Sequence, residues 1–223
     1  MTEEEGIGHR RAGRPLQTVL TQRRITEAAL HLIGAAGYEA FTMAKLAGSL
    51  GVAPSALYNH AASKQVVLQW LQDHVMTMID VSGFGAGPWP EAVRQWAWSY
   101  RDVFARHVPL ISIVAVLPVT GAPQTLRMYE SVATGLRDAG LPSAQIVPTI
   151  VALESFIFGS AFDVNAPEDI FDTDGLAESS PNFSAAVELQ RAETGRIRAD
   201  IAFGFGLEAL IRGIAATRTV PGS

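Results

Sequence analysis

The sequence predicts an all-α fold. Apolar residues recur every three or four positions along most of the 223 residues, which is the spacing of one face of a helix. Residue types that begin and end helices, namely Thr, Ser, Pro and Gly, stand at the ends of these stretches. No two alternating segments joined by a turn indicate a pair of strands. The chain is also long enough to bury a core and to divide into two domains.

Three short helices are predicted near the amino terminus. The first begins at Thr21, whose side chain can cap it, and ends at Gly37. The second begins at Thr42 and ends at Gly51, which supplies a tight turn. The third begins at Pro54, because a missing N–H costs nothing in the first turn of a helix. The residues that it leaves facing outward or sideways are Ser55, Ala56, Tyr58, Asn59 and His60.

Residues 37–64 therefore predict a helix-turn-helix, which presents one helix to the DNA major groove. The charge distribution agrees with this interpretation. Seven basic and two acidic residues lie between positions 9 and 64, whereas ten basic and seventeen acidic residues follow them. A basic block on an acidic body indicates phosphate contact at one end only, and the alternative is a chance fluctuation over a short window. Residues 1–20 are expected to form a flexible basic arm.

Longer helices are predicted after Ser63, which can cap the first of them. Its apolar face consists of Leu68, Leu71, Val75, Met78 and Ile79. The sequence GFGAGP at 83–88 interrupts the chain, and Pro90 starts the next helix. The segments predicted after that helix are a short apolar stretch at 109–117, helices at 123–139 and 143–163, a loop at 164–183 and a last helix at about 185–217.

Residues 143–163 are apolar on nearly every side, and a helix of this kind is buried on two faces. One face can pack on the core of its own chain and the other on a partner subunit. The last helix keeps Gly204 and Gly206 in its interior at a cost in helix propensity, which close approach of another helix would explain.

Residues 21–70 resemble the DNA-binding domain of the TetR/AcrR family of transcriptional repressors. The matching positions are Ala28-Ala29-Leu30, Gly37-Tyr38, Thr42, Leu46-Ala47, Leu50-Gly51-Val52, Ala56-Leu57-Tyr58, His60 and Ser63-Lys64. The resemblance implies a homodimer whose larger domain binds a small effector and whose effector-bound form releases DNA. We expect the two subunits to join through residues 143–163 and 196–216. It divides the chain into the arm (1–20), a helix-turn-helix DNA-binding domain (21–64) and an effector-binding and dimerisation domain (65–223).

The resemblance also assigns roles within the DNA-binding domain. Tyr58, His60 and Lys64 would contact the DNA backbone, and the alternatives are packing at a helix end for the first two and a solvated charge for Lys64. Ser55, Ala56 and Asn59 would approach base edges. The capping hydroxyl of Thr42 and the adjacent N–H groups can meet a phosphate, and Lys45 adds a positive charge to the same helix.

The start of the third predicted helix lacks the side chains that usually distinguish one base from another. Residues 53–56 lack Arg, Gln and Lys, the side chains that form paired hydrogen bonds to bases, so this helix alone discriminates bases modestly. We therefore expect the arm to add affinity by lying along the minor groove through Arg10, Arg11 and Arg14, as in the similar core of AT-hook segments. The alternative is a disordered basic tail that gives only salt-dependent attraction.

The middle of the chain is rich in aromatic residues, which predicts an apolar pocket for a small apolar effector. The candidate ligand-binding residues are Trp96, Tyr100, Phe104, His107, Met128 and Phe158. The alternative for the aromatic residues and Met128 is ordinary core packing, and for His107 it is a core or helix-end position.

Several functional classes are not indicated by the sequence. The chain has no Cys, no convincing His or carboxylate cluster for a metal, and no nucleophile or dinucleotide motif in a suitable context. We predict no enzyme activity, no cofactor, no membrane segment or signal peptide, and a cytoplasmic location. The predicted function is a ligand-responsive regulator, most simply a repressor, that binds a palindromic operator. The alternatives are activation, or a helical small-molecule-binding or interaction protein without a DNA role, and the sequence names neither effector nor operator.

Overall fold

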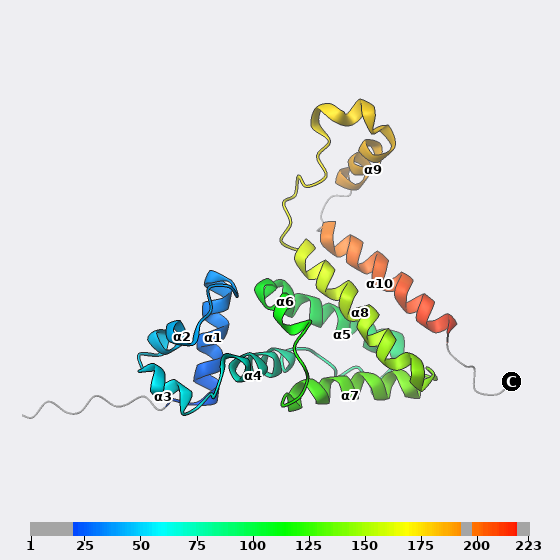
Figure 1. The fold of residues 1–223 in the computed structure, drawn as a ribbon. Coiled ribbons are helices and arrows are strands. Elements are labelled where there is room, and N and C mark those ends of the chain that lie inside the picture. The colour runs from blue at the N-terminus through cyan, green and yellow to red at the C-terminus, as the bar shows by residue number, and fades with distance from the viewer. Residues whose placement is uncertain (1–19, 193–197, 218–223) are drawn as a thin grey trace, which may run out of the picture.

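The computed structural model describes residues 20–192 and 198–217, and these residues form helices and no strands, as the sequence predicts. Figure 1 shows a compact amino-terminal group of helices followed by a larger helical body. The α-helices are α1 (Gln22–Ala36), α2 (Met43–Leu50), α3 (Pro54–Tyr58), α4 (Lys64–Met76), α5 (Trp89–Ala105), α6 (Ile111–Val114), α7 (Pro123–Asp138), α8 (Ser143–Asp163), α9 (Pro181–Ala192) and α10 (Arg198–Ala216), with short 3-10 helices η1 (Val108–Leu110) and η2 (Asp174–Ser179).

Capping residues and glycines fix the ends of the amino-terminal helices at the predicted positions. The hydroxyls of Thr21, Thr42 and Ser63 cap α1, α2 and α4 by accepting hydrogen bonds from backbone N–H groups three residues later. Gly51 ends α2 in the left-handed region, at φ 69°, which glycine adopts without the strain of a side chain. Apolar faces of α1, α2 and α3 then meet in a small core that continues into α4.

Helix α4 joins the amino-terminal helices to the rest of the molecule, because it packs on α1 and on α7. Its contact with α7 includes specific polar bonds. The N-cap of α7, Ala122, offers no capping side chain, and Asp73 of α4 takes its place. One carboxylate oxygen of Asp73 accepts hydrogen bonds from the backbone N–H groups of Gln124, at 2.6 Å, and Thr125, at 2.9 Å.

The predicted apolar face of α4 is wrong at Met78. This residue lies beyond the end of the helix, and 40% of it is exposed.

The larger body is built around α5, which packs on α7, α8 and α10. Ion pairs hold α10 against this group. The buried guanidinium of Arg101 in α5 lies 2.7 Å from the Asp200 carboxylate, and Arg198 lies 2.8 Å from Asp163 of α8. Among the described residues, α8 alone has the length and apolar character of a membrane-spanning helix, and four of its residues are buried against the body.

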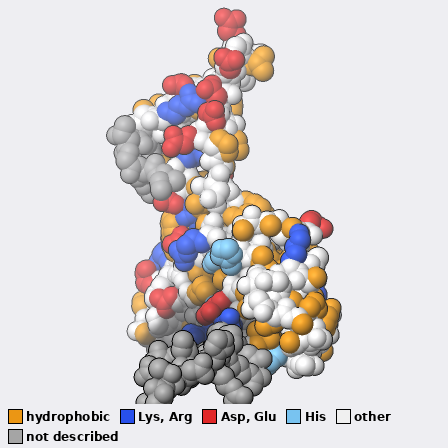
Figure 2. All heavy atoms as spheres, turned by 90° about the vertical axis from the view of Figure 1, so that its left-hand side faces the viewer, with side chains coloured by type: hydrophobic (Ala, Val, Ile, Leu, Met, Phe, Trp, Pro, Cys, Tyr) orange, Lys and Arg blue, Asp and Glu red, His pale blue; other side chains and the backbone are white. Residues whose placement is uncertain are grey.

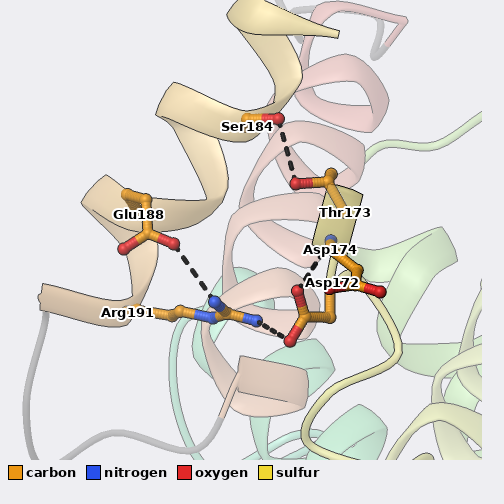
Figure 3. A network of polar contacts seen from close by, with 6 residues as sticks. All are labelled: Asp172, Thr173, Asp174, Ser184, Glu188 and Arg191. Atoms are coloured by element: carbon orange, nitrogen blue, oxygen red, sulfur yellow. Dashed lines mark hydrogen bonds and ion pairs between the residues drawn. The ribbon is translucent and has the colours of Figure 1, made fainter. Parts of the chain in front are cut away.

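The structure corrects the prediction for the carboxy-terminal region. The predicted loop at 164–183 contains η2 and the start of α9, and two helices, α9 and α10, replace the single predicted helix at 185–217. Between Leu189 and Ile197 the sequence has one apolar residue, Ala192, so an interruption of the apolar pattern was available as a signal. Residues 164–192, here called the lobe, stand above the body in Figures 1 and 2. A polar network in which Arg191 pairs with Asp172 and Glu188 joins η2 to α9 (Figure 3).

Candidate functional site

Helix α3 is held by one deeply buried side chain, which leaves its other side open. Leu57 is fully buried in the core beneath the helix. Ser55, Asn59 and His60 are exposed, Ala56 is half-buried and Tyr58 is 49% exposed. The geometry therefore offers a small polar surface on a short helix after a tight turn, which is the arrangement predicted for base contact.

A second polar feature lies where α4 begins. Lys64, the first residue of α4, is half-buried, and its Nζ atom lies 4.1 Å from the centroid of the Tyr38 ring and 5.4 Å from that of Phe41. The aromatic faces attract the ammonium group and limit its positions. A cation and the free N–H groups of a helix start both favour an anion, so this site suits a phosphate.

The remaining candidate DNA contacts divide into two groups. Thr42 and Lys45 are exposed at the start of α2, where the Thr42 hydroxyl accepts a hydrogen bond from the Lys45 N–H at 3.2 Å. The three arginines predicted to form the basic arm, Arg10, Arg11 and Arg14, lie outside the described residues.

Most of the residues predicted to bind an effector lie together in the larger body. Trp96, Tyr100 and Phe104 of α5 are fully buried, and Met128 of α7 belongs to the same core. The ring centroid of Phe158 in α8 lies 5.5 Å from that of Tyr100 and 5.0 Å from that of Phe104. These rings form one aromatic cluster between α5 and α8.

His107, the remaining candidate ligand-binding residue, lies outside the helix that carries Tyr100 and Phe104. Helix α5 ends at Ala105, and His107 precedes η1 instead. Burial, with the nearby charges of Arg106 and His74, lowers the pKa of His107, which favours the neutral ring.

Glu154 of α8 is the polar centre of this cluster, and it was not predicted from the sequence. Its Oε1 atom accepts hydrogen bonds from the hydroxyls of Tyr100, at 2.9 Å, and Tyr129 of α7, at 2.8 Å. Burial raises the pKa of Glu154, and burial together with the Glu154 charge raises the pKa of both tyrosines. A signal was available, because Glu154 is the only charged residue between positions 143 and 162.

A separate cavity of about 460 Å³ lies between the 83–88 segment, the start of α5 and the end of α7. Phe84 and Trp89 contribute aromatic surface to it, and Glu130 and Asp138 contribute carboxylates. None of the predicted ligand-binding residues lines this cavity. Within the described parts of the chain, no group of three or more His, Asp or Glu side chains is arranged to hold a metal ion.

Comparison with known proteins identifies the family. Residues 25–69 match the family described as bacterial regulatory proteins, tetR family, and residues 84–218 match the tetracyclin repressor-like, C-terminal domain. The chain belongs to the TetR family of transcriptional regulators. This confirms the family and the fold class predicted from the sequence. Members of the TetR family are transcription factors rather than enzymes, in agreement with the predicted absence of catalysis.

Individual TetR-family relatives cover nearly the whole chain. The HTH-type transcriptional repressor DrrR1 of Streptomyces coeruleorubidus is 25% identical over 92% of this chain and 81% of its own length. The class E tetracycline repressor of Escherichia coli is 24% identical over 84% of this chain and 87% of its own. ActR of Streptomyces coelicolor in complex with (S)-DNPA is 27% identical, with a TM-score of 0.73 over 91% of this chain and all of that structure. A structure of ActR with actinorhodin has the same TM-score and 26% identity.

Because the pKa of Glu154 is raised, we expect the stability of the protein to depend on pH. Because the folded pKa of Glu154 is raised, the folded state binds more protons than the unfolded state above the ordinary value of 4.5. Glu154 therefore lowers stability as pH rises from that value through the folded pKa, by at most about 1.4 kcal/mol per pH unit. In Glu154→Gln the neutral amide still accepts from the tyrosines, so its stability relative to wild type should increase over this range.

Urea unfolding at a series of pH values, followed by circular dichroism, measures this difference. Glu130→Gln is the matched control, because Glu130 is exposed on α7. A pH-independent difference between Glu154→Gln and wild type would contradict the assignment of Glu154 as a destabilising buried charge.

Proposed function

We propose that this TetR-family protein is a homodimeric repressor that binds a palindromic operator and leaves it when a small effector binds. The observation that carries the proposal is the outward polar side of α3, fixed beneath by Leu57, within the region that matches the tetR family. The chain is divided accordingly, with residues 21–64 binding DNA and residues 65–223 binding effector and partner. A repressor of this kind acts in the cytoplasm.

The proposed operator contacts follow from the exposed side chains. Ser55, Ala56 and Asn59 approach base edges, while Tyr58 at the end of α3 and His60 in the turn after it meet the backbone. The Lys64 ammonium, the Thr42 hydroxyl and the exposed Lys45 bind phosphates from α4 and α2. Arg10, Arg11 and Arg14 add contacts along the minor groove. The two α3 helices of a dimer then read half-sites about one DNA turn, ~34–36 Å, apart.

The proposed dimer interface consists of the outer faces of α8 and α10. On α8, Val147 is 67% exposed, Val151 is 53% exposed and Phe162 is 52% exposed. On α10, Phe205 is 77% exposed, and its exposed neighbours on the helix surface include the small residues Ala202, Ala209 and Gly213 and the charged residue Arg212. An exposed apolar surface of this kind marks an interface, and the small residues of α10 permit close approach of a second helix. Two copies of α8 and α10 would form a four-helix contact.

The proposed effector response uses the connection between α7 and α4. An effector among the aromatic side chains of α5, α7 and α8 shifts α7. The Asp73 bonds to the N–H groups of Gln124 and Thr125 pass that shift to α4, which also packs on α1. Tilting α4 changes the spacing of the two α3 helices and weakens operator binding, with a coupling on the usual scale of ~1–3 kcal/mol.

Operator binding is tested by Lys64→Ala. Loss of one phosphate contact in each subunit should weaken binding and reduce the slope of log K against log salt concentration by about two. The measurement is a salt titration with the duplex DNA that flanks the encoding gene, using fluorescence anisotropy. Arg127→Ala, which removes an exposed cation from α7, is the control and should leave both values unchanged. Equal losses in the two variants, or no loss in Lys64→Ala, would contradict the proposed contact.

Dimerisation is tested by Phe205→Glu. A charge at the centre of an apolar interface loses its water without gaining a partner, so this variant should be monomeric at micromolar concentration, where the wild type is a dimer. Sedimentation velocity measures the mass of each species. Leu126→Glu places the same charge on an exposed apolar site of α7 and should remain dimeric. A dimeric Phe205→Glu protein, or a monomeric wild type, would overturn the proposed interface.

A further inference from the structure

The Glu154 carboxylate has the features of a recognition group rather than of a structural ion pair. It lies where α5, α7 and α8 meet, and both tyrosine hydroxyls donate to the same oxygen, Oε1. The hydrogen bonds of the described residues include none to Oε2. This second oxygen is therefore available as an acceptor.

The negative charge of Glu154 is also uncompensated. No Lys, Arg or His in the described ranges, 20–192 and 198–217, forms an ion pair with it, and the hydroxyls of Tyr100 and Tyr129 are neutral donors. The Glu154 carboxylate is half-buried, and even partial withdrawal from water without a cation is costly, so burial raises its pKa. A positively charged group placed beside it would remove that cost.

Aromatic rings pack around Tyr100, one of the two donors to Glu154. Tyr100 donates to Glu154 and lies within 5.6 Å of Trp96, 5.3 Å of Phe104 and 5.5 Å of Phe158, measured between ring centroids. The indole N–H of Trp96 is fully buried and has no hydrogen-bond partner. Aromatic faces attract cations as well as flat apolar ligands, and an unused donor offers a further contact to a ligand acceptor.

We propose that the effector is an aromatic amine, whose ammonium group binds Glu154 and whose rings enter the aromatic cluster of Trp96, Tyr100, Phe104 and Phe158. Tyr100 and Tyr129 orient the carboxylate by fixing Oε1, which leaves Oε2 for the ligand. The inference rests on the proposed effector function and narrows its ligand from any small apolar molecule to a cationic one.

The test compares two probes of the same size, 1-naphthylmethylamine, which is positively charged at neutral pH, and 1-naphthylmethanol, which is neutral. Isothermal titration calorimetry with the full chain, without DNA, should give at least about tenfold tighter binding of the amine, since hydrogen bonds to charged groups are the stronger ones. Glu154→Gln should bind both probes alike, because it keeps the shape and the tyrosine bonds but removes the charge.

Glu130→Gln is the control, because Glu130 lines the other cavity and could attract the same cation there. It should keep the wild-type preference for the amine. The inference is overturned if wild type does not prefer the amine, if Glu154→Gln keeps the preference, or if Glu130→Gln abolishes it. Operator binding, measured separately, distinguishes this failure from a failure of the proposed function, since a chain that binds operator but ignores the amine refutes only the inference.

Discussion

The bond between Asp73 and the start of α7 is the constraint on which the proposed regulation depends. Helix α7 lacks a cap of its own, so its first free N–H groups are satisfied only by a carboxylate from α4. Because α4 also packs on α1, any displacement of α7 must either move α4 or break this cap. The orientation of the amino-terminal helices therefore depends in part on contacts made about fifty residues later in the sequence, and α1 also packs directly on η1.

The same helix α7 reaches the polar centre of the aromatic cluster. Tyr129, near the middle of α7, donates to Glu154 of α8, and Asp73 binds the start of the same helix. A ligand at Glu154 would therefore act on a helix that is held at its start by Asp73. Helix α10 is held to α5 and α8 by Arg101–Asp200 and Arg198–Asp163, so the proposed dimer surface provides a stable frame against which α7 can move.

The helix ends, which depend on nearby residues, were predicted from the sequence. The contacts between residues far apart in the sequence were not. Thr42 and Gly51 mark the helix-turn-helix through capping and turn preferences that act within a few residues. The Glu154 site and the Asp73 cap join residues 25 to 54 positions apart, and no spacing in the sequence reveals such pairs. The division between α9 and α10 was missed although the apolar pattern is interrupted between Leu189 and Ile197. Exposure of the α3 side chains was predictable, whereas their contacts with DNA remain a prediction.

The most direct test measures the distance between the two α3 helices of the proposed dimer. The chain has no Cys, so Asn59→Cys gives one spin-label site per subunit for pulsed electron paramagnetic resonance. The account predicts a single narrow distance distribution, which broadens when Asp73→Ala removes the cap of α7 and stays narrow when Asp102→Ala removes an exposed carboxylate from α5. An Asp73→Ala distribution as narrow as that of the parent would contradict the claim that this bond fixes the DNA-binding helices.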